Sequence, residues 1–364
     1  MRDPKVRLLG TLFLCVWVPL VLSVFDAVDF QRSLSTAVRF IGYPLAGIFI
    51  VQALSDDKAR QVVFIGTAIV VGFWCLDAMI QWTLGYDVFG YPSQPGALTG
   101  VFYPKIRLGV VTAVFAPVLY EGVRRYGRRY PWSWLVLLAM VAAVILNGRR
   151  AGWMMLAIAT VGYVAYLYFV AERRQWLRWM AVGGVAFAIA VGMVSQTQLV
   201  QDRMSRTLAV FQGDYEGINR ATSLRLGIWR VGAEIARDHP VNGIGGRGYD
   251  AASEHYVQER GVDGMVSTHA HLFALEIAAE TGLIGIAGYA VFLVVLVRGL
   301  LGVPRQAWPR VWPWGIGALV AGFPLNVNHA FYGSFWSAIF WWLVFVTIAM
   351  MPEQRAPARR AAVA

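Results

Sequence analysis

The chain has 364 residues, of which 58% are hydrophobic and only 15% are charged. Soluble domains carry about a quarter charged residues, so this composition excludes an ordinary soluble protein and indicates an integral membrane protein. The net charge is +11, with three lysines and twenty-nine arginines. These basic residues lie in short clusters between apolar runs, which is typical of membrane topology and favours anionic lipid or phosphate partners over nucleic acid.

Ten apolar runs approach the length of about 20 residues that a helix needs to cross a bilayer. They are residues 8–25, 34–54, 62–82, 106–121, 132–147, 151–170, 179–195, 272–297, 311–328 and 335–351. The runs at 106–121 and 311–328 are the weakest of the set. The sequence therefore predicts an all-α, polytopic membrane bundle.

The basic residues predict an orientation for this bundle. Eighteen lysines and arginines fall on one side, in both tails and in the loops after the second, fourth, sixth and eighth runs. Cytoplasmic loops carry an excess of Lys and Arg, so we expect this side, and with it both termini, to be cytoplasmic.

The opposite side carries two long loops. The first, residues 83–105, is rich in Gly and Pro and leads to Lys105 and Arg107 at the outer interface. The second, residues 196–270, is about 75 residues long and divides the chain into N-terminal helices (1–195), a large loop, and C-terminal helices (271–364).

Helical periodicity runs through part of this second loop. Residues 196–211 have apolar residues at helical spacing, and a turn is expected at 213–219. A second helix should then be capped by Thr222 or Ser223 and end at Asp238–Pro240. Its expected apolar face is formed by Leu224, Ile228, Val231 and Ile235. We therefore predict a small folded helical cap on the membrane.

Arginines on this outer side are candidates for binding an anion. Arg149 and Arg150 lie in a short turn between two apolar runs, against the topology signal. They either snorkel to lipid headgroups or bind a phosphate, whose geometry a guanidinium matches. Arg225 lies near the start of the expected second helix, where it either stacks on Trp229 or joins the same anion site.

Histidines and carboxylates near the last three runs are candidates for acid–base chemistry. His271 lies where a polar loop enters an apolar helix, with His269 two residues earlier, and His329 lies on the same outer side. Imidazole accepts a proton near neutral pH, so His271 is the best candidate for a general base. Glu276 and Glu280 lie four residues apart on one helix face, where they line a cavity, pair with an arginine or are structural. The sequence offers no nucleotide-binding motif and no metal-ligand cluster, so we expect no cofactor and no metal.

The segment H-L-x9-G-L-I-G, residues 271–285, resembles the pattern H-[NSQ]-x9-G-x-x-[GTY] of the O-antigen ligase and polymerase superfamily. His271, Gly282 and Gly285 match at the right spacing, and Leu272 departs from the polar residue that the family prefers.

Three further segments are similar to this family in the same order. R-A-G-W at 150–153 is similar to an R-G-x-W-like turn and favours Arg150 over Arg149. Arg225, followed by a Pro-x-x-G-x-G turn, resembles an element of the family's large loop, and P-L-N-V-N-H-A-F resembles the segment before the last helix. Because members of the family often have about twelve helices, the resemblance extends the expected number to about 10–12.

The resemblance implies an inverting, metal-independent glycosyl transfer at the periplasmic face of a bacterial inner membrane. The donor would be O-antigen polysaccharide on undecaprenyl pyrophosphate, and the acceptor would be the lipid A–core oligosaccharide. His271 would be the general base, and Arg150, Arg225 and Arg149 would bind the pyrophosphate. Possible supporting residues are His269, Glu280, Lys105, Arg107 and His329.

Two alternatives to an O-antigen ligase stay open. Within the same superfamily, an O-antigen polymerase or an O-oligosaccharyltransferase is the close alternative, because nothing in the sequence identifies the acceptor. In a different class, a polysaccharide or lipid transporter is compatible with the many helices and with Asp77, Glu276 and Glu280 at membrane depth.

Overall fold

The fold is helical throughout the part of the chain that the computed structural model describes, residues 3–170, 173–327 and 329–353, in which no β-strand forms. The α-helices are α1 (Pro4–Leu22), α2 (Phe30–Phe40), α3 (Gly42–Ala53), α4 (Asp57–Leu84), α5 (Leu108–Tyr126), α6 (Ser133–Leu146), α7 (Arg150–Val170), α8 (Arg173–Ser195), α9 (Gln198–Leu208), α10 (Tyr215–Ala221), α11 (Leu226–Asp238), α12 (Tyr249–Gln258), α13 (Phe273–Leu301), α14 (Trp308–Ala321) and α15 (Ser334–Met350). Short 3-10 helices are η1 (Ser23–Asp26), η2 (Gly100–Phe102), η3 (Ala209–Gln212) and η4 (Arg305–Ala307).

The predicted apolar runs all form helices, which confirms a polytopic helical membrane protein. Among the residues that the structure describes, five segments are long and apolar enough to cross a bilayer: Pro4–Asp26, Phe30–Ala53, Asp57–Leu84, Arg150–Val170 and Phe273–Leu301. The run at 311–328 ends early, at Ala321, because Pro324 disfavours helical backbone before it. The number of crossings and their orientation stay predictions, and four of the tail arginines used for it (Arg2, Arg355, Arg359 and Arg360) lie outside the described residues.

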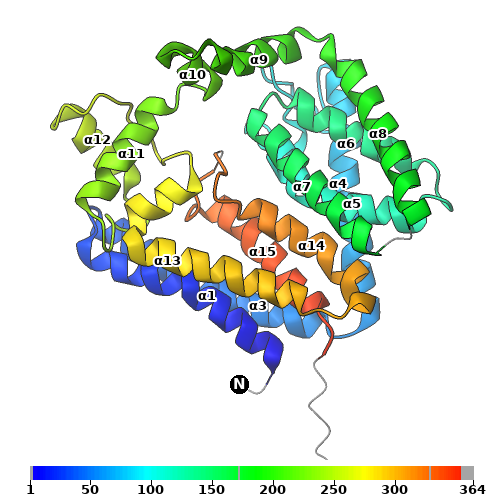
Figure 1. The fold of residues 1–364 in the computed structure, drawn as a ribbon, viewed down its shortest axis with the longest axis horizontal. Coiled ribbons are helices and arrows are strands. Elements are labelled where there is room, and N and C mark those ends of the chain that lie inside the picture. The colour runs from blue at the N-terminus through cyan, green and yellow to red at the C-terminus, as the bar shows by residue number, and fades with distance from the viewer. Residues whose placement is uncertain (1–2, 171–172, 328, 354–364) are drawn as a thin grey trace, which may run out of the picture.

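The helices form two groups that α14 connects. On one side α13 lies along α1, and α15 packs on α3. On the other side α4 to α8 pack together, and α14 contacts α5, α7 and α15. Residues 196–225, which we call the arch, carry α9, η3 and α10 from the end of α8 across to α11 (Figure 1).

Helix α13 is interrupted at Gly282, which has φ +61° and ψ −159°. A second segment supplies the hydrogen bonds that the interruption removes. The N–H groups of Leu283 and Ile284 donate to the carbonyls of Pro240 and Val241, at 2.8 and 3.3 Å. A Cβ at Gly282 would lie 2.1 Å from the Val241 carbonyl oxygen, so only glycine allows this approach.

The same segment continues into a glycine-rich turn that binds the other side of the break. The N–H groups of Ile244 and Gly245 donate to the carbonyls of Ala279 and Glu280, both at 3.0 Å. The turn also joins the N-terminal helices, since the Ser33 hydroxyl donates to the Gly246 carbonyl at 3.1 Å. Residues far apart in the sequence therefore meet where α13 is broken.

The loop between α4 and α5 is held by buried polar side chains of the helices beneath it. Gln81 accepts hydrogen bonds from the N–H groups of Thr99 and Gly100, both at 2.9 Å. Asp77 accepts the Val88 N–H at 2.9 Å and is buried, so this carboxyl holds a loop. Asn147 donates to the Leu98 carbonyl at 2.6 Å and fixes the loop beside the Arg149–Arg150 turn.

The helix and turn expected in the long loop differ from those observed. Residues 215–221 form α10, which Asp214 caps through the Gly217 N–H at 2.7 Å, where a turn had been predicted. Neither Thr222 nor Ser223 caps α11, which begins only at Leu226. Ser223 and Leu224 instead adopt left-handed backbone with φ +62°, which leaves Leu224 outside the helix and 53% exposed. The end of α11 at Asp238 and its buried face of Ile228, Val231 and Ile235 are confirmed.

Replacing Gly282 with alanine should destabilise the protein, because the new Cβ meets backbone and φ +61° is unfavourable for alanine. We expect Gly282→Ala to cost about 1–3 kcal/mol, measured as a lowered unfolding temperature in detergent. The control is Gly66→Ala within α4, where a Cβ meets nothing within 4 Å. It should be neutral or slightly stabilising, and equal losses in both variants would contradict the role of the break.

Candidate active site

His271 lies in the short segment that leads into α13, two residues before Phe273. Its backbone is left-handed, with φ +52°, a conformation that costs free energy in a residue with a Cβ. Its ring Nδ1 lies 3.3 Å from the Val327 carbonyl oxygen, which can accept a hydrogen bond but not donate one. This contact selects the tautomer with the proton on Nδ1 and leaves the Nε2 lone pair available to accept a proton.

His269 stacks beside His271. The two ring centroids are 3.8 Å apart and the rings are tilted by 43°. The Nδ1 of His269 lies 3.1 Å from the Thr268 hydroxyl, and the Ser267 hydroxyl donates to the His269 carbonyl at 3.0 Å. The structure therefore brings together the two histidines that the sequence had singled out.

The environment of His271 keeps its imidazole neutral at pH 7. Burial lowers its pKa to about 4, with further contributions from the positive charges of Arg225 and Arg149. The hydrogen bond to the Val327 carbonyl acts in the opposite direction and is outweighed. A neutral imidazole is the form that can act as a general base.

Three arginines come together beside this histidine. Burial, together with the charges of Arg149 and Arg150, lowers the pKa of Arg225 to about 10. Arg225 precedes the first residue of α11, whereas Arg149 and Arg150 lie at the start of α7. The fold thus concentrates positive charge from two distant parts of the chain.

Arg150 also holds the arch in place. Its guanidinium donates to the Ser223 hydroxyl at 2.6 Å, the Arg220 carbonyl at 3.2 Å and the Thr207 hydroxyl at 3.1 Å. The left-handed residues Ser223 and Leu224 directly precede Arg225. The bond to Ser223 therefore fixes the strained segment that positions Arg225.

His329 and Arg107 extend the cluster from the loop between α14 and α15 and from the start of α5. Burial, together with the charges of Arg107, His271 and Arg149, lowers the pKa of His329 to about 3. The His329 ring stacks on Trp336 with centroids 5.0 Å apart, and the Arg107 guanidinium lies 3.8 Å from the centre of the Phe335 ring. Two residues expected only as supporting members therefore lie in the cluster.

Neighbouring cations act on one another in this cluster. Burial and the positive charges beside them lower the pKa values of His271, His329 and Arg225. Partly buried cations of like charge repel one another, and an anion bound among them relieves that repulsion. The arrangement can therefore bind a phosphate or pyrophosphate group next to a neutral imidazole.

Three other candidates lie outside this cluster. Glu280 accepts the Arg247 N–H at 2.8 Å and so supports the glycine-rich turn. Glu276 accepts the Phe331 N–H at 2.8 Å and supports the loop that carries Val327 and His329. Lys105 is exposed in its loop. The described residues contain no group of three or more His, Cys, Asp or Glu that could hold a metal ion.

Sequence reasoning missed the backbone contributions to the site. The Val327 carbonyl that orients His271 has no signature in residue type. The left-handed conformations of Ser223, Leu224 and His271 also carry no signal, because they do not occur at glycines. The signal in the sequence that did point to the site was the order and spacing of the motifs that contain Arg150, Arg225 and His271.

Together, fold and site define a polytopic helical membrane protein that places a neutral histidine among arginines near the end of a broken helix. Residues 135–290 match the family model described as O-antigen ligase. The exopolysaccharide production protein ExoQ of Rhizobium meliloti (strain 1021) is 20% identical over 322 residues, which cover 85% of this chain and 69% of that protein. Both matches bear out the resemblance to the O-antigen ligase and polymerase superfamily that the residues at 271–285 had indicated. The superfamily consists of glycosyltransferase-like enzymes that act on lipid-linked polysaccharides.

The lowered pKa of His271 predicts a pH dependence of stability. A folded pKa of about 4 lies below the unfolded value of about 6.5, so this stabilisation is complete above pH 6.5 and is lost as the pH falls toward 4. Over that range His271→Gln should lose less stability than the wild type, by at most about 3 kcal/mol. Unfolding temperatures at several pH values test this. His329→Gln should behave similarly, and parallel curves for all three proteins would contradict the prediction.

Proposed function

We propose that the protein transfers a glycan from a lipid-linked pyrophosphate donor to a hydroxyl acceptor, with His271 as the general base. The observation that carries the proposal is a neutral imidazole whose ring is oriented by the Val327 carbonyl and whose pKa is lowered by the neighbouring charges of Arg225 and Arg149. The arginines fit the pyrophosphate, and the imidazole fits the acceptor hydroxyl. No other component is needed to activate the donor, because pyrophosphate is a good leaving group once its charge is neutralised.

The reaction proceeds as a single displacement. The Nε2 of His271 takes the proton of the acceptor hydroxyl while the hydroxyl oxygen bonds to the anomeric carbon of the donor sugar. The bond from that carbon to the pyrophosphate oxygen breaks, and its electron pair leaves with the pyrophosphate. Arg225, Arg149 and Arg150 stabilise the growing negative charge. Because attack and departure occur on opposite faces, the anomeric configuration inverts.

Donor binding would prepare the base for this step. In the free site the arginine charges contribute to a pKa of about 4 for His271, which makes the imidazole a weak base. A bound pyrophosphate offsets those charges, and a nearby anion stabilises the imidazolium. The pKa of His271 therefore rises when donor is present, so base strength is coupled to donor occupancy.

The complete proposal is an O-antigen ligase of the bacterial inner membrane. Its donor is polysaccharide on undecaprenyl pyrophosphate, its acceptor is the lipid A–core oligosaccharide, and its site faces the periplasm with both termini in the cytoplasm. The contact between Arg150 and the arch supports the proposed donor, because it places the arginine cluster at one end of the helices. A lipid-linked pyrophosphate presents its charge at the same level, the surface of the membrane.

A chain-extending polymerase is the second candidate. The similarity to ExoQ, whose name assigns it to exopolysaccharide production, favours this reading. Both reactions use the same donor chemistry and differ in the acceptor, which is lipid A–core in one case and another lipid-linked glycan in the other. The arrangement of His271 and the arginines serves either reaction.

The membrane-depth carboxylates argue against a transporter. Asp77, Glu276 and Glu280 each accept a backbone N–H, from Val88, Phe331 and Arg247. Each of them thereby fixes a loop. The proposal of a transferase accounts for these bonds without assigning the carboxylates to a transport path.

The decisive experiment is a transfer assay with purified protein, an undecaprenyl-pyrophosphate-linked glycan and lipid A–core, in EDTA and without nucleotide. We expect product with wild-type protein and a loss of about 10²–10⁴-fold with His271→Ala, because the base is removed. His255→Ala is the matched control, since His255 is half exposed and pairs with Glu259. Full activity of a folded His271→Ala variant would sink the proposal. Lengthened glycan on the carrier without ligated product would establish the polymerase.

Arg225 should act on donor use. Arg225→Ala is expected to lower kcat/KM for the donor about 10–100-fold, as loss of a charge-assisted hydrogen bond does. Arg225→Lys should recover only part, because lysine lacks the planar fork. The control is Arg230→Ala in α11, the helix that Arg225 precedes, where the Arg230 side chain is exposed and pairs with Asp263. If Arg225→Ala and Arg230→Ala used donor equally well, Arg225 would have no role in binding it.

A further inference from the structure

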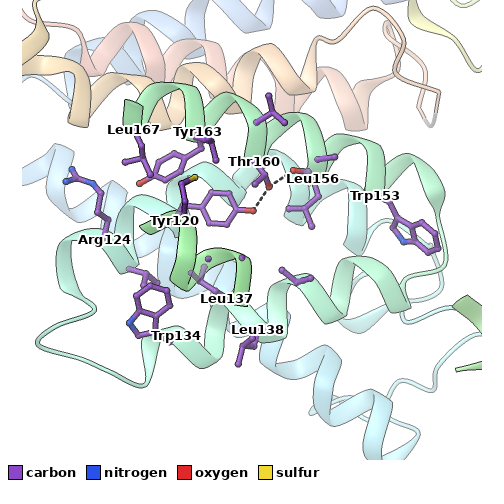
Figure 2. Close-up of a pocket in the computed structure, with 18 of the residues that line it drawn as sticks. Tyr120, Arg124, Trp134, Leu137, Leu138, Trp153, Leu156, Thr160, Tyr163 and Leu167 are labelled. Carbon is purple, nitrogen blue, oxygen red and sulfur yellow. Dashed lines mark hydrogen bonds between the residues drawn. The ribbon is translucent and has the colours of Figure 1, made fainter. Parts of the chain in front are cut away.

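A cavity lies outside the cluster just described, in the group of helices α5 to α8. Its volume is about 680 Å³, within the range of ligand pockets, and its walls are almost entirely apolar. Figure 2 shows it between Trp153 at one end and Arg124 and Trp134 at the other. We call it the lateral groove.

The lateral groove follows the direction of the helices through much of the membrane. Along α7 its lining extends from Trp153 to Leu167, a span of about 21 Å at the usual helical rise. The hydrocarbon core of a bilayer is about 30 Å thick, so the groove covers more than half of it. Exposed lining residues such as Val161 and Gly184 open it to the flank of the protein. These dimensions suit a hydrocarbon chain that enters from the surrounding lipid.

The two ends of the groove differ in charge. The end nearest His271 is lined by Ile145, Trp153 and Met204, and none of the arginines of the candidate active site lines it. Arg124 lies at the other end and is the charged residue among the described lining residues. An amphiphile places its anionic group at the cationic end, which here is the end remote from His271.

The remote end carries net positive charge within a buried network. Glu121 is fully buried and accepts hydrogen bonds from Arg124 at 2.8 and 2.6 Å, and from Arg125 at 2.8 Å. One carboxylate thus faces two guanidiniums, which leaves one positive charge. Arg128 and Arg129 follow in the exposed turn after α5. This charge complements the phosphate of an acidic lipid.

Aromatic residues mark the level at which that phosphate would lie. Tyr130 and Trp132 are 42% and 61% exposed beside the turn, and Trp134 lines the groove. Exposed Tyr and Trp residues are enriched at the headgroup level of bilayers. The arginines and the aromatic residues therefore lie together at one membrane interface.

We propose that the lateral groove binds one acyl chain of an anionic phospholipid whose headgroup lies at the Arg124 end. The lipid fills the space between α6, α7 and α8 and stabilises the position of α8. This site is separate from the donor site, because a donor chain would bring its pyrophosphate to the opposite end. The proposal does not depend on the reaction that His271 catalyses.

The test uses full-length protein in detergent, with native mass spectrometry to detect retained lipid and unfolding temperatures to measure binding. We expect wild-type protein to retain an anionic phospholipid. Added phosphatidylglycerol should raise the unfolding temperature by about 2–4 °C more than phosphatidylcholine with the same chains. Undecaprenyl phosphate is the third probe.

Gly184→Leu fills the groove and is matched by Gly192→Leu on the same helix. A Cβ at either glycine meets nothing within 4 Å, and leucine favours helix, so both variants should fold. Gly184 is a lining residue of the groove and Gly192 is not among those residues. Of the two variants, Gly184→Leu should therefore lose the retained lipid and the phosphatidylglycerol effect, and Gly192→Leu should keep both. Equal effects of the two phospholipids, or an unchanged response of Gly184→Leu, would overturn the proposal. Selective stabilisation by undecaprenyl phosphate, lost in Gly184→Leu, would assign the groove to the donor. Transfer assays are read separately, so either proposal can fail alone.

Discussion

The structure depends on the exchange of hydrogen bonds where α13 is broken. A helix interrupted at membrane depth exposes backbone groups that lipid cannot satisfy, so the gap at Gly282 requires a partner. Residues 240–245 supply it from both sides of the break. This contact fixes the first part of α13 against the glycine-rich turn, and with it the segment that carries His271. Gly282 is required because the Val241 backbone approaches it closely, and Gly245 because Ala27 and the Ser33 side chain lie against it.

Electrostatic repulsion is a property of the free site. The charges of Arg149 and Arg150 lie close enough to Arg225 to lower the pKa of its guanidinium. Contacts elsewhere offset the cost of this repulsion to folding. The hydrogen bonds from Arg150 to Ser223 and Thr207 in the arch are examples. Arg150 thus both fixes the arch and contributes positive charge to the cluster. A substitution at Arg150 would therefore change the position of Arg225 as well as the local charge. Arg225 is the cleaner position for separating the two effects.

Hydrophobic length predicted the helices well, because a run of about 20 apolar residues has few alternatives in a bilayer. The resemblance of motifs to the family predicted that His271, Arg150 and Arg225 act together. The structure adds that these residues lie in one region. The secondary structure predicted for residues 213–225 was wrong. Asp214 caps a helix where a turn was predicted, and the Ser223 hydroxyl accepts a hydrogen bond from Arg150 in place of capping α11. The orientation of His271 by Val327 also could not be predicted, because a backbone carbonyl 56 residues away has no pattern in the sequence.

The contact between the N-terminal helices and the glycine-rich turn sets an order for biogenesis. Ser33 and Gly246, whose hydrogen bond joins them, are 213 residues apart in the chain. At about 5–20 residues per second, α1 and α2 wait about 10–40 s on the ribosome before their partner is synthesised. Arg32 and Ser33 pass this interval without the bonds to Asp250 and Gly246 that they form in the finished protein. The site is therefore completed late in synthesis, and a chain truncated before Gly282 has all of its N-terminal helices but no organised centre.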